Sequence, residues 1–137
     1  NFLGDQFSMF EAFDRLSIVM NPAYSYQDDI FVPGLAEKII RKALGIATDV
    51  VAALLPVKWL ASGGRYALFS ELTPAGIYIL CERPSMPPGD IIAELGDRAF
   101  RRGKIDYCWI VWDKTAQPRA FAPTYWIPAR PLSERRA

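Results

Sequence analysis

Two apolar runs near the middle of the chain, residues 65–71 and 76–82, are rich in aromatic and aliphatic side chains. Tyr66, Ile77 and Tyr78 are residue types that favour strands. The sequence Thr-Pro-Ala-Gly between the two runs is a turn signal. We therefore predict that the two runs pair as an antiparallel hairpin at the centre of the fold.

A periodic apolar stripe near the N-terminus predicts a helix over residues 3–20. The apolar positions recur every three or four residues: Phe7, Phe10, Phe13, Leu16 and Met20. This spacing puts the side chains on one helix face. The dipeptide Asn21-Pro22 ends the helix, because a residue that precedes proline disfavours the helical conformation. The segment that follows, residues 21–34, is predicted to be a loop.

Three further helices are indicated by apolar spacing and by the placement of charge. Residues 35–44 have one apolar face and end just before Gly45, a residue type common after helix C-termini. Residues 50–61 are predicted as a helix that Pro56 kinks. Residues 91–102 follow an aspartate and carry arginines near their end, which suits the dipole of a helix.

A third strand and the tail complete the predicted fold. Residues 105–112 are apolar at almost every position, which is typical of a central strand that is buried on both faces. Residues 120–121 and 125–127 are predicted to form an edge strand, and residues 133–137 a disordered basic tail. The fold class that we predict is a single α+β domain over residues 1–132, with a mixed or antiparallel sheet and helices packed mainly on one face.

Composition excludes several kinds of chemistry. The 137 residues include 16 basic and 15 acidic side chains, a net charge of +1, so we expect no dedicated nucleic-acid partner while a local basic patch stays open. Histidine is absent, which removes Ser-His-Asp and Cys-His catalysis and every histidine-containing metal site. Two cysteines are too few for a zinc site made of cysteine alone, so we expect no metal.

The cysteines and the termini bear on localisation. Cys81 and Cys108 each lie inside an apolar run, which predicts buried, unpaired and inert thiols in the cytoplasm. No apolar run has the length needed to span a membrane. The N-terminus has neither an initiator methionine nor a signal pattern, so we expect a fragment or the loss of a few residues.

Short motifs in the middle of the chain carry a resemblance to a known family. They are Leu-Leu-Pro at 54–56, Arg-Tyr-Ala-Leu at 65–68, Pro-Ala-Gly-Ile-Tyr at 74–78, and residues 81–85. Together they resemble the RTX toxin-activating lysine acyltransferases. The resemblance implies an acetyltransferase-like (GNAT-like) fold. It also implies transfer of a fatty acyl group from acyl carrier protein, or from an acyl-CoA donor, to a lysine of a protein partner.

The same resemblance suggests three catalytic residues. Tyr24, in the sequence Asn-Pro-Ala-Tyr, stands where the family has its essential histidine. Asp106 and Asp113 bracket the place of the family's aspartate on the late aromatic strand. A carboxylate or a tyrosine can transfer a proton in place of histidine, provided that its pKa is tuned toward neutrality. The residues therefore leave open whether the chain is an active acyltransferase or a degenerate one.

The alternative is a non-catalytic protein-interaction or assembly module. Four late aromatic residues either fill the core or form an exposed interface cluster: Trp109, Trp112, Tyr125 and Trp126. The proline-rich segment 117–131 fits an arm that lies on a neighbouring protein. We accordingly predict Tyr125 and Trp126 as partner-binding residues, with a protein partner and with a homodimer left open.

Overall fold

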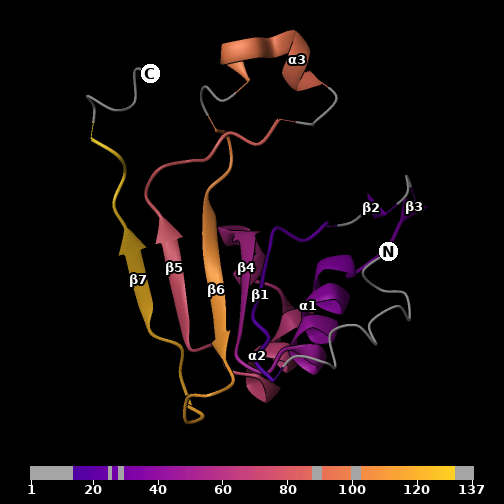
Figure 1. Ribbon diagram of the computed structural model, residues 1–137, viewed down its shortest axis with the longest axis vertical. Helices are drawn as coiled ribbons and strands as arrows, with labels where there is room; N and C mark the ends of the chain where they lie inside the picture. The colour runs from indigo at the N-terminus through magenta and orange to yellow at the C-terminus, as the bar shows by residue number, and fades with distance from the viewer. Residues whose placement is uncertain (1–13, 25, 28–29, 88–90, 100–102, 132–137) are drawn as a thin grey trace.

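A five-stranded mixed sheet organises the structure (Figure 1). The computed structural model describes residues 14–24, 26–27, 30–87, 91–99 and 103–131. The strands lie in the order β1 (Ile18–Met20), β4 (Val50–Pro56), β6 (Tyr107–Asp113), β5 (Gly76–Leu80) and β7 (Thr124–Ile127). The pairs β1–β4 and β5–β7 are parallel, whereas β6 runs antiparallel to both β4 and β5. The fold class is α+β, as predicted.

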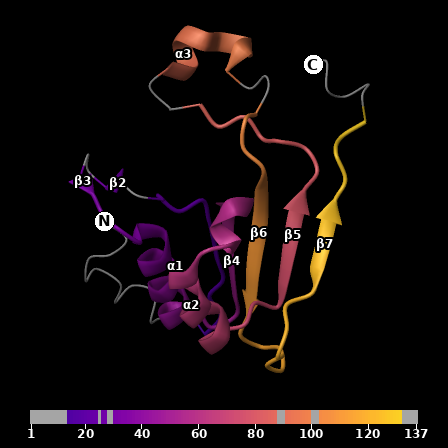
Figure 2. The same cartoon turned by 180° about the vertical axis from the view of Figure 1, so that it is seen from behind.

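Two helices cover one face of this sheet (Figures 1 and 2). The first, α1 (Leu35–Ile46), connects β1 to β4, and the second, α2 (Tyr66–Glu71), precedes β5. The remaining elements are short: β2 (Tyr26–Gln27), β3 (Ile30–Phe31), α3 (Ile92–Leu95) and the 3-10 helices Val57–Leu60, Gly63–Arg65 and Gly96–Arg98. The parallel strands β1 and β4 with the connecting α1 form a β-α-β unit.

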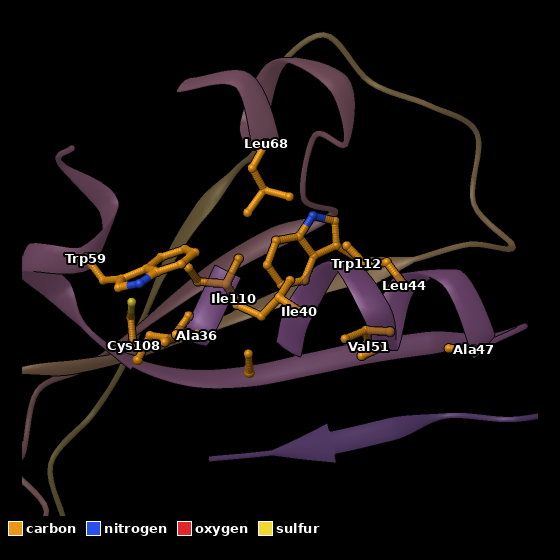
Figure 3. Packing of buried hydrophobic residues seen from close by; sticks show 13 residues of the cluster. Ala36, Ile40, Leu44, Ala47, Val51, Trp59, Leu68, Cys108, Ile110 and Trp112 are labelled. Atoms are coloured by element: carbon orange, nitrogen blue, oxygen red, sulfur yellow. The ribbon is translucent and has the colours of Figure 1, made fainter. Parts of the chain in front are cut away.

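The core lies between the two helices and the sheet (Figure 3). Alternate residues of a strand point to the same face, so the two central strands each contribute every second side chain: Val51, Ala53 and Leu55 from β4, and Cys108, Ile110 and Trp112 from β6. From the helices, Ala36, Ile40, Ala43 and Leu68 pack in the same core. Burial of these apolar side chains is the main free-energy gain that holds α1 and α2 on the sheet.

Helix 35–44 and strand 105–112 are confirmed. The helix extends to Ile46, so Gly45 lies inside its last turn and Ala47 caps it. The strand spans Tyr107–Asp113 and occupies the middle of the sheet. Part of the predicted edge strand is also confirmed, because β7 contains residues 125–127, whereas residues 120–121 lie outside any strand.

The predicted helix over residues 50–61 is wrong. Residues 50–56 form strand β4, and only Val57–Leu60 are helical, as a 3-10 turn. Almost every position of this segment is apolar, so its sequence has no period that distinguishes a buried strand from a buried helix. Pairing with β1 and β6 on its two sides decides in favour of the strand.

The predicted hairpin is wrong in its first arm. Residues 66–71 are helical in α2, and β5 pairs with β6 and β7 instead. The helical turn directs Leu68 into the core, where it is fully buried, while Tyr66 is exposed. The second arm is confirmed as β5, in the same sheet as β6.

Other predicted boundaries change as well. Residues 3–13 of the predicted N-terminal helix and the tail at 133–137 lie outside the described residues. The end of that helix is wrong, because Ile18–Met20 form β1. The loop at 21–34 contains the small β2–β3 pair. The helix at 91–102 is reduced to α3 and one 3-10 turn, with residues 100–102 outside the described part.

The two cysteines differ from each other. Both are unpaired, as predicted, but only Cys108 is buried, and Cys81 is exposed. Cys81 directly follows the last residue of β5, where the chain leaves the sheet. Its apolar neighbours in the sequence therefore do not enclose it.

Candidate functional site

The carboxyl end of β1 carries two polar side chains that are hydrogen-bonded to each other, Asn21 and Tyr24. Asn21 directly follows the last residue of this strand, and Pro22 behind it is buried. In open sheets with β-α-β connections, ligands bind outside the carboxyl ends of the parallel strands. The segment Asn21–Tyr24 occupies that place, next to the end of β4.

Asn21 and Tyr24 are joined by a hydrogen bond. The Tyr24 hydroxyl donates to Asn21 Oδ1 at 3.0 Å, and Asn21 Nδ2 lies 3.8 Å from the sulfur of Met86. A thioether is a weak acceptor, so the donor capacity of the amide is largely unused among the described residues. Asn21 is exposed and Tyr24 is half-buried. The pair therefore presents an amide to solvent with an aromatic ring beside it.

The environment of Tyr24 keeps its hydroxyl protonated. Burial raises the pKa of Tyr24 well above its ordinary value, and the neighbouring Tyr107 raises this pKa further. A phenol in this state donates hydrogen bonds but does not accept a proton at neutral pH. Tyr24 is thus suited to orienting Asn21 or a ligand, and unsuited to acting as a general base.

Asp106 precedes Tyr107 at the same end of the sheet, but its carboxylate binds Arg83. Its carboxylate accepts from Arg83 Nε at 2.6 Å and from Arg83 Nη2 at 3.3 Å. Both side chains of this ion pair are more than half exposed. The Arg83 contact joins the loop after β5 to the start of β6, so a structural role explains it.

Asp113 lies at the opposite end of β6. The strand has seven residues at about 3.3 Å each, so Asp113 is about 20 Å from Tyr107. The Asp113 carboxylate accepts from the backbone N–H groups of Thr115 and Ala116 and from the Thr115 hydroxyl. The hydrogen bonds from Thr115 lower its pKa. The structure thus places Tyr24 beside Tyr107, the residue that follows Asp106, while Asp113 lies at the far end of the same strand.

Two lysines lie at the same end of the sheet as the Asn21–Tyr24 segment. Lys58 follows the end of β4, and Lys104 precedes the start of β6. Both are exposed, and neither forms an ion pair with another residue of the described ranges. No described carboxylate pairs with the charge of these two lysines.

The predicted partner-binding residues lie on the far edge of the sheet. Tyr125 and Trp126 belong to β7, and Trp126 has 66% of its surface exposed. The Tyr125 ring stacks on Tyr78 of β5 with a centroid distance of 5.0 Å. Of the other two aromatic residues in question, Trp112 is buried in the core and Trp109 is half-buried.

Comparison with known proteins adds no assignment. No family model, curated protein or solved structure matched this chain. Within the part of the chain that the structure describes, no group of three or more histidine, cysteine, aspartate or glutamate side chains is placed to hold a metal ion. None of the helices in the described ranges has the length and apolar character needed to cross a membrane.

Sequence reasoning missed Asn21 and the two lysines at the same end of the sheet. The signal was present: the apolar, partly β-branched run Ile-Val-Met stands immediately before Asn-Pro-Ala-Tyr. Such a run is compatible with a short strand, and a polar residue directly after a parallel strand is a candidate ligand contact. The helix predicted over residues 3–20 concealed this signal.

Proposed function

We propose that the carboxyl end of β1 binds a nucleobase, held by the amide of Asn21 and the ring of Tyr24. The observation that carries this proposal is the exposed amide of Asn21, fixed by Tyr24 at the end of a parallel strand. An amide offers an acceptor and a donor side by side, and this pattern matches the adjacent donor and acceptor on the edge of a base, as when asparagine binds adenine.

The hydrogen-bonding capacity of Asn21 supports a ligand of this kind. Its Oδ1 accepts one hydrogen bond, from Tyr24, and has a second lone pair. Its Nδ2 has only the weak contact with the Met86 sulfur among the described residues. A planar base edge satisfies both groups at once. The Tyr24 ring packs against the core and is only half-buried, and we infer that its exposed part is the surface on which a base that has left its stack is held.

The flanking charge favours a base that belongs to a nucleic acid. Lys58 and Lys104 are exposed at the same end of the sheet and form no ion pair with another described residue, and lysines of this kind neutralise phosphates. The balanced net charge of the whole chain predicts no nucleic-acid partner. A local positive edge is nevertheless sufficient for a single-stranded segment, because the phosphates beside a bound base interact only with nearby charges.

Acyl transfer and the GNAT-like architecture stay predictions from the resemblance. The two proton-transfer candidates Asp106 and Asp113 lie at opposite ends of β6, and the raised pKa of Tyr24 disfavours a basic role. An assay with acyl carrier protein as the donor, with Tyr24→Phe for comparison, tests that hypothesis. Binding of a protein partner rests on a separate surface at β7 and is compatible with nucleobase binding.

The test uses ten-nucleotide single-stranded DNAs of one base each and an abasic strand of the same length. Fluorescence anisotropy at low salt measures their dissociation constants. Asn21→Asp keeps the shape of the side chain but replaces the N–H donors by a carboxylate. We expect a loss of about 1–3 kcal/mol, or about 5-fold to 150-fold in affinity. Gln117→Glu, the same chemical change in an exposed loop beyond β6, should leave affinity within about twofold.

Two outcomes contradict the proposal. Equal binding of the abasic and base-containing strands would reduce the interaction to phosphate contacts alone. Equal effects of Asn21→Asp and Gln117→Glu would remove Asn21 from the binding site. Tyr24→Leu provides an independent check, because loss of a stacking ring weakens binding by about 1–3 kcal/mol per base.

A further inference from the structure

The strand β7 forms one edge of the sheet (Figure 1). Its inner side is defined by two hydrogen bonds, from Ile77 N–H to the Pro123 carbonyl and from Cys81 N–H to the Ile127 carbonyl. Backbone groups of successive strand residues point to alternate sides. The N–H and C=O groups of Thr124 and Trp126 therefore point outward, away from β5.

Within the described residues, this edge strand carries no charged side chain, although it is short and has a proline on each side. Natural edge strands are shielded by charged residues, prolines, bulges or a covering element. Thr124–Ile127 contains no charge and no proline, and its two ends are marked by Pro123 and Pro128. Thr124 and all three apolar side chains of the strand are exposed. An uncharged, exposed edge of this kind is a template for pairing with another strand.

We propose that β7 pairs with β7 of a second copy of this chain, antiparallel and about a two-fold axis at Tyr125. In this register Thr124 of each copy faces Trp126 of the other, and each such pair exchanges two backbone hydrogen bonds. Four hydrogen bonds then join two sheets into one continuous sheet. The proposal goes beyond nucleobase binding and does not depend on it.

The backbone and side chains of β7 are suited to pairing with a second copy of the same strand. A two-fold interface needs a surface that complements itself. The strand β7 meets this condition because Thr124 and Trp126 each direct one backbone N–H donor and one C=O acceptor outward. Tyr125 of the two copies meet at the axis on the face where Tyr125 already stacks on Tyr78. Arg130 nearby is neutralised by Glu82 at 2.7 Å, so little like charge opposes the approach.

The size of the interface sets the expected strength. A four-residue strand with its side chains buries less than the roughly 1,200 Å² of a stable complex. The dimer should accordingly be weak and depend on concentration. Sedimentation velocity over a wide range of protein concentration should show a monomer that converts reversibly into a dimer.

Trp126→Lys is the disrupting variant, because it places a charge on the edge strand. Phe121→Lys is its matched control: Phe121 is 68% exposed, close to Trp126 in exposure, and lies outside β7. We expect Trp126→Lys to remain monomeric at concentrations where wild type and Phe121→Lys dimerise. A wild type that stays monomeric at every concentration, or a dimer that Trp126→Lys leaves intact, overturns the proposal.

Cross-linking tests the register itself. In a Cys81→Ser background, which removes the exposed thiol, Tyr125→Cys puts two cysteines opposite each other in a non-hydrogen-bonded pair, where the Cα atoms are about 4.5 Å apart. That distance allows a disulfide, formed by loss of two electrons and two protons to added oxidised glutathione. Trp126→Cys should cross-link poorly, since its partner residue is Thr124. Preferential cross-linking through Trp126→Cys would exclude this register.

Discussion

Lys114 follows β6 and reaches the carboxyl end of α1. Its Nζ donates to the Leu44 carbonyl at 2.8 Å and to the Ala47 carbonyl at 2.5 Å. The last turn of α1 has no basic residue of its own, although a helix leaves its final carbonyls without partners and favours a cation there. Lys114 supplies this cation from a distant part of the chain, and we expect its loss to destabilise the fold.

The magnitude follows from the two hydrogen bonds. A hydrogen bond to a charged group contributes about 1.5–3 kcal/mol when it is buried, but Lys114 is exposed, so water replaces much of what is lost. A cation at a helix end contributes about 0.3–1 kcal/mol at an exposed site. We therefore expect Lys114→Met to lower the free energy of unfolding by about 1–2 kcal/mol in total.

Urea unfolding followed by circular dichroism measures this difference. Lys38→Met, at an exposed position near the other end of α1, removes the same charge without reaching the last carbonyls. It should change stability by less than about 0.5 kcal/mol, as exposed substitutions usually do. If Lys114→Met and Lys38→Met unfold at the same urea concentration, Lys114 does not stabilise the end of α1.

Two further predictions concern titratable groups. A colorimetric thiol reagent should rapidly label the exposed Cys81 of the native protein. It should react with Cys108 only on unfolding, because burial encloses this thiol and raises its pKa to about 11. Rapid labelling of both cysteines would contradict the packing of β6. Folding also raises the pKa of Tyr24 above 10.0, first by burial and then through Tyr107, so this contribution to stability is complete below pH 10 and is lost as the pH rises beyond it. Urea titrations from pH 8 to pH 11 should show a smaller alkaline loss for Tyr24→Phe than for wild type, and identical losses would refute the assignment.

Two elements, α1 and β6, were predicted correctly from a pattern within their own segment. The apolar face of helix 35–44 alternates with charged residues at helical spacing, and the structure has this helix as α1. Strand 105–112 is short, bounded by polar residues and rich in aromatic and β-branched types, which distinguishes it from a helix. The apolar residues on both faces of this strand also predicted its central position in the sheet, which β6 occupies.

Local sequence failed where two structures were nearly equal in propensity. Residues 50–61 are apolar throughout and have no period, and residues 65–71 combine aromatic residues with good helix formers such as alanine, leucine and glutamate. In each segment packing made the choice. Hydrogen bonds to two neighbouring strands fixed β4, and burial of Leu68 against the sheet fixed α2.

The amino-acid sequence by itself thus determined the α+β class, the helix α1 and the central strand β6, because each depends on a pattern that a single segment carries. Only the tertiary structure decided the candidate sites. Asn21 lies at the end of a parallel strand because Ile18–Met20 pairs with residues 51–53, more than thirty positions later. Trp126 lies at the edge of the sheet because, among the described strands, β7 pairs with β5 alone. Both positions depend on pairing between distant segments, which no local pattern of residues specifies.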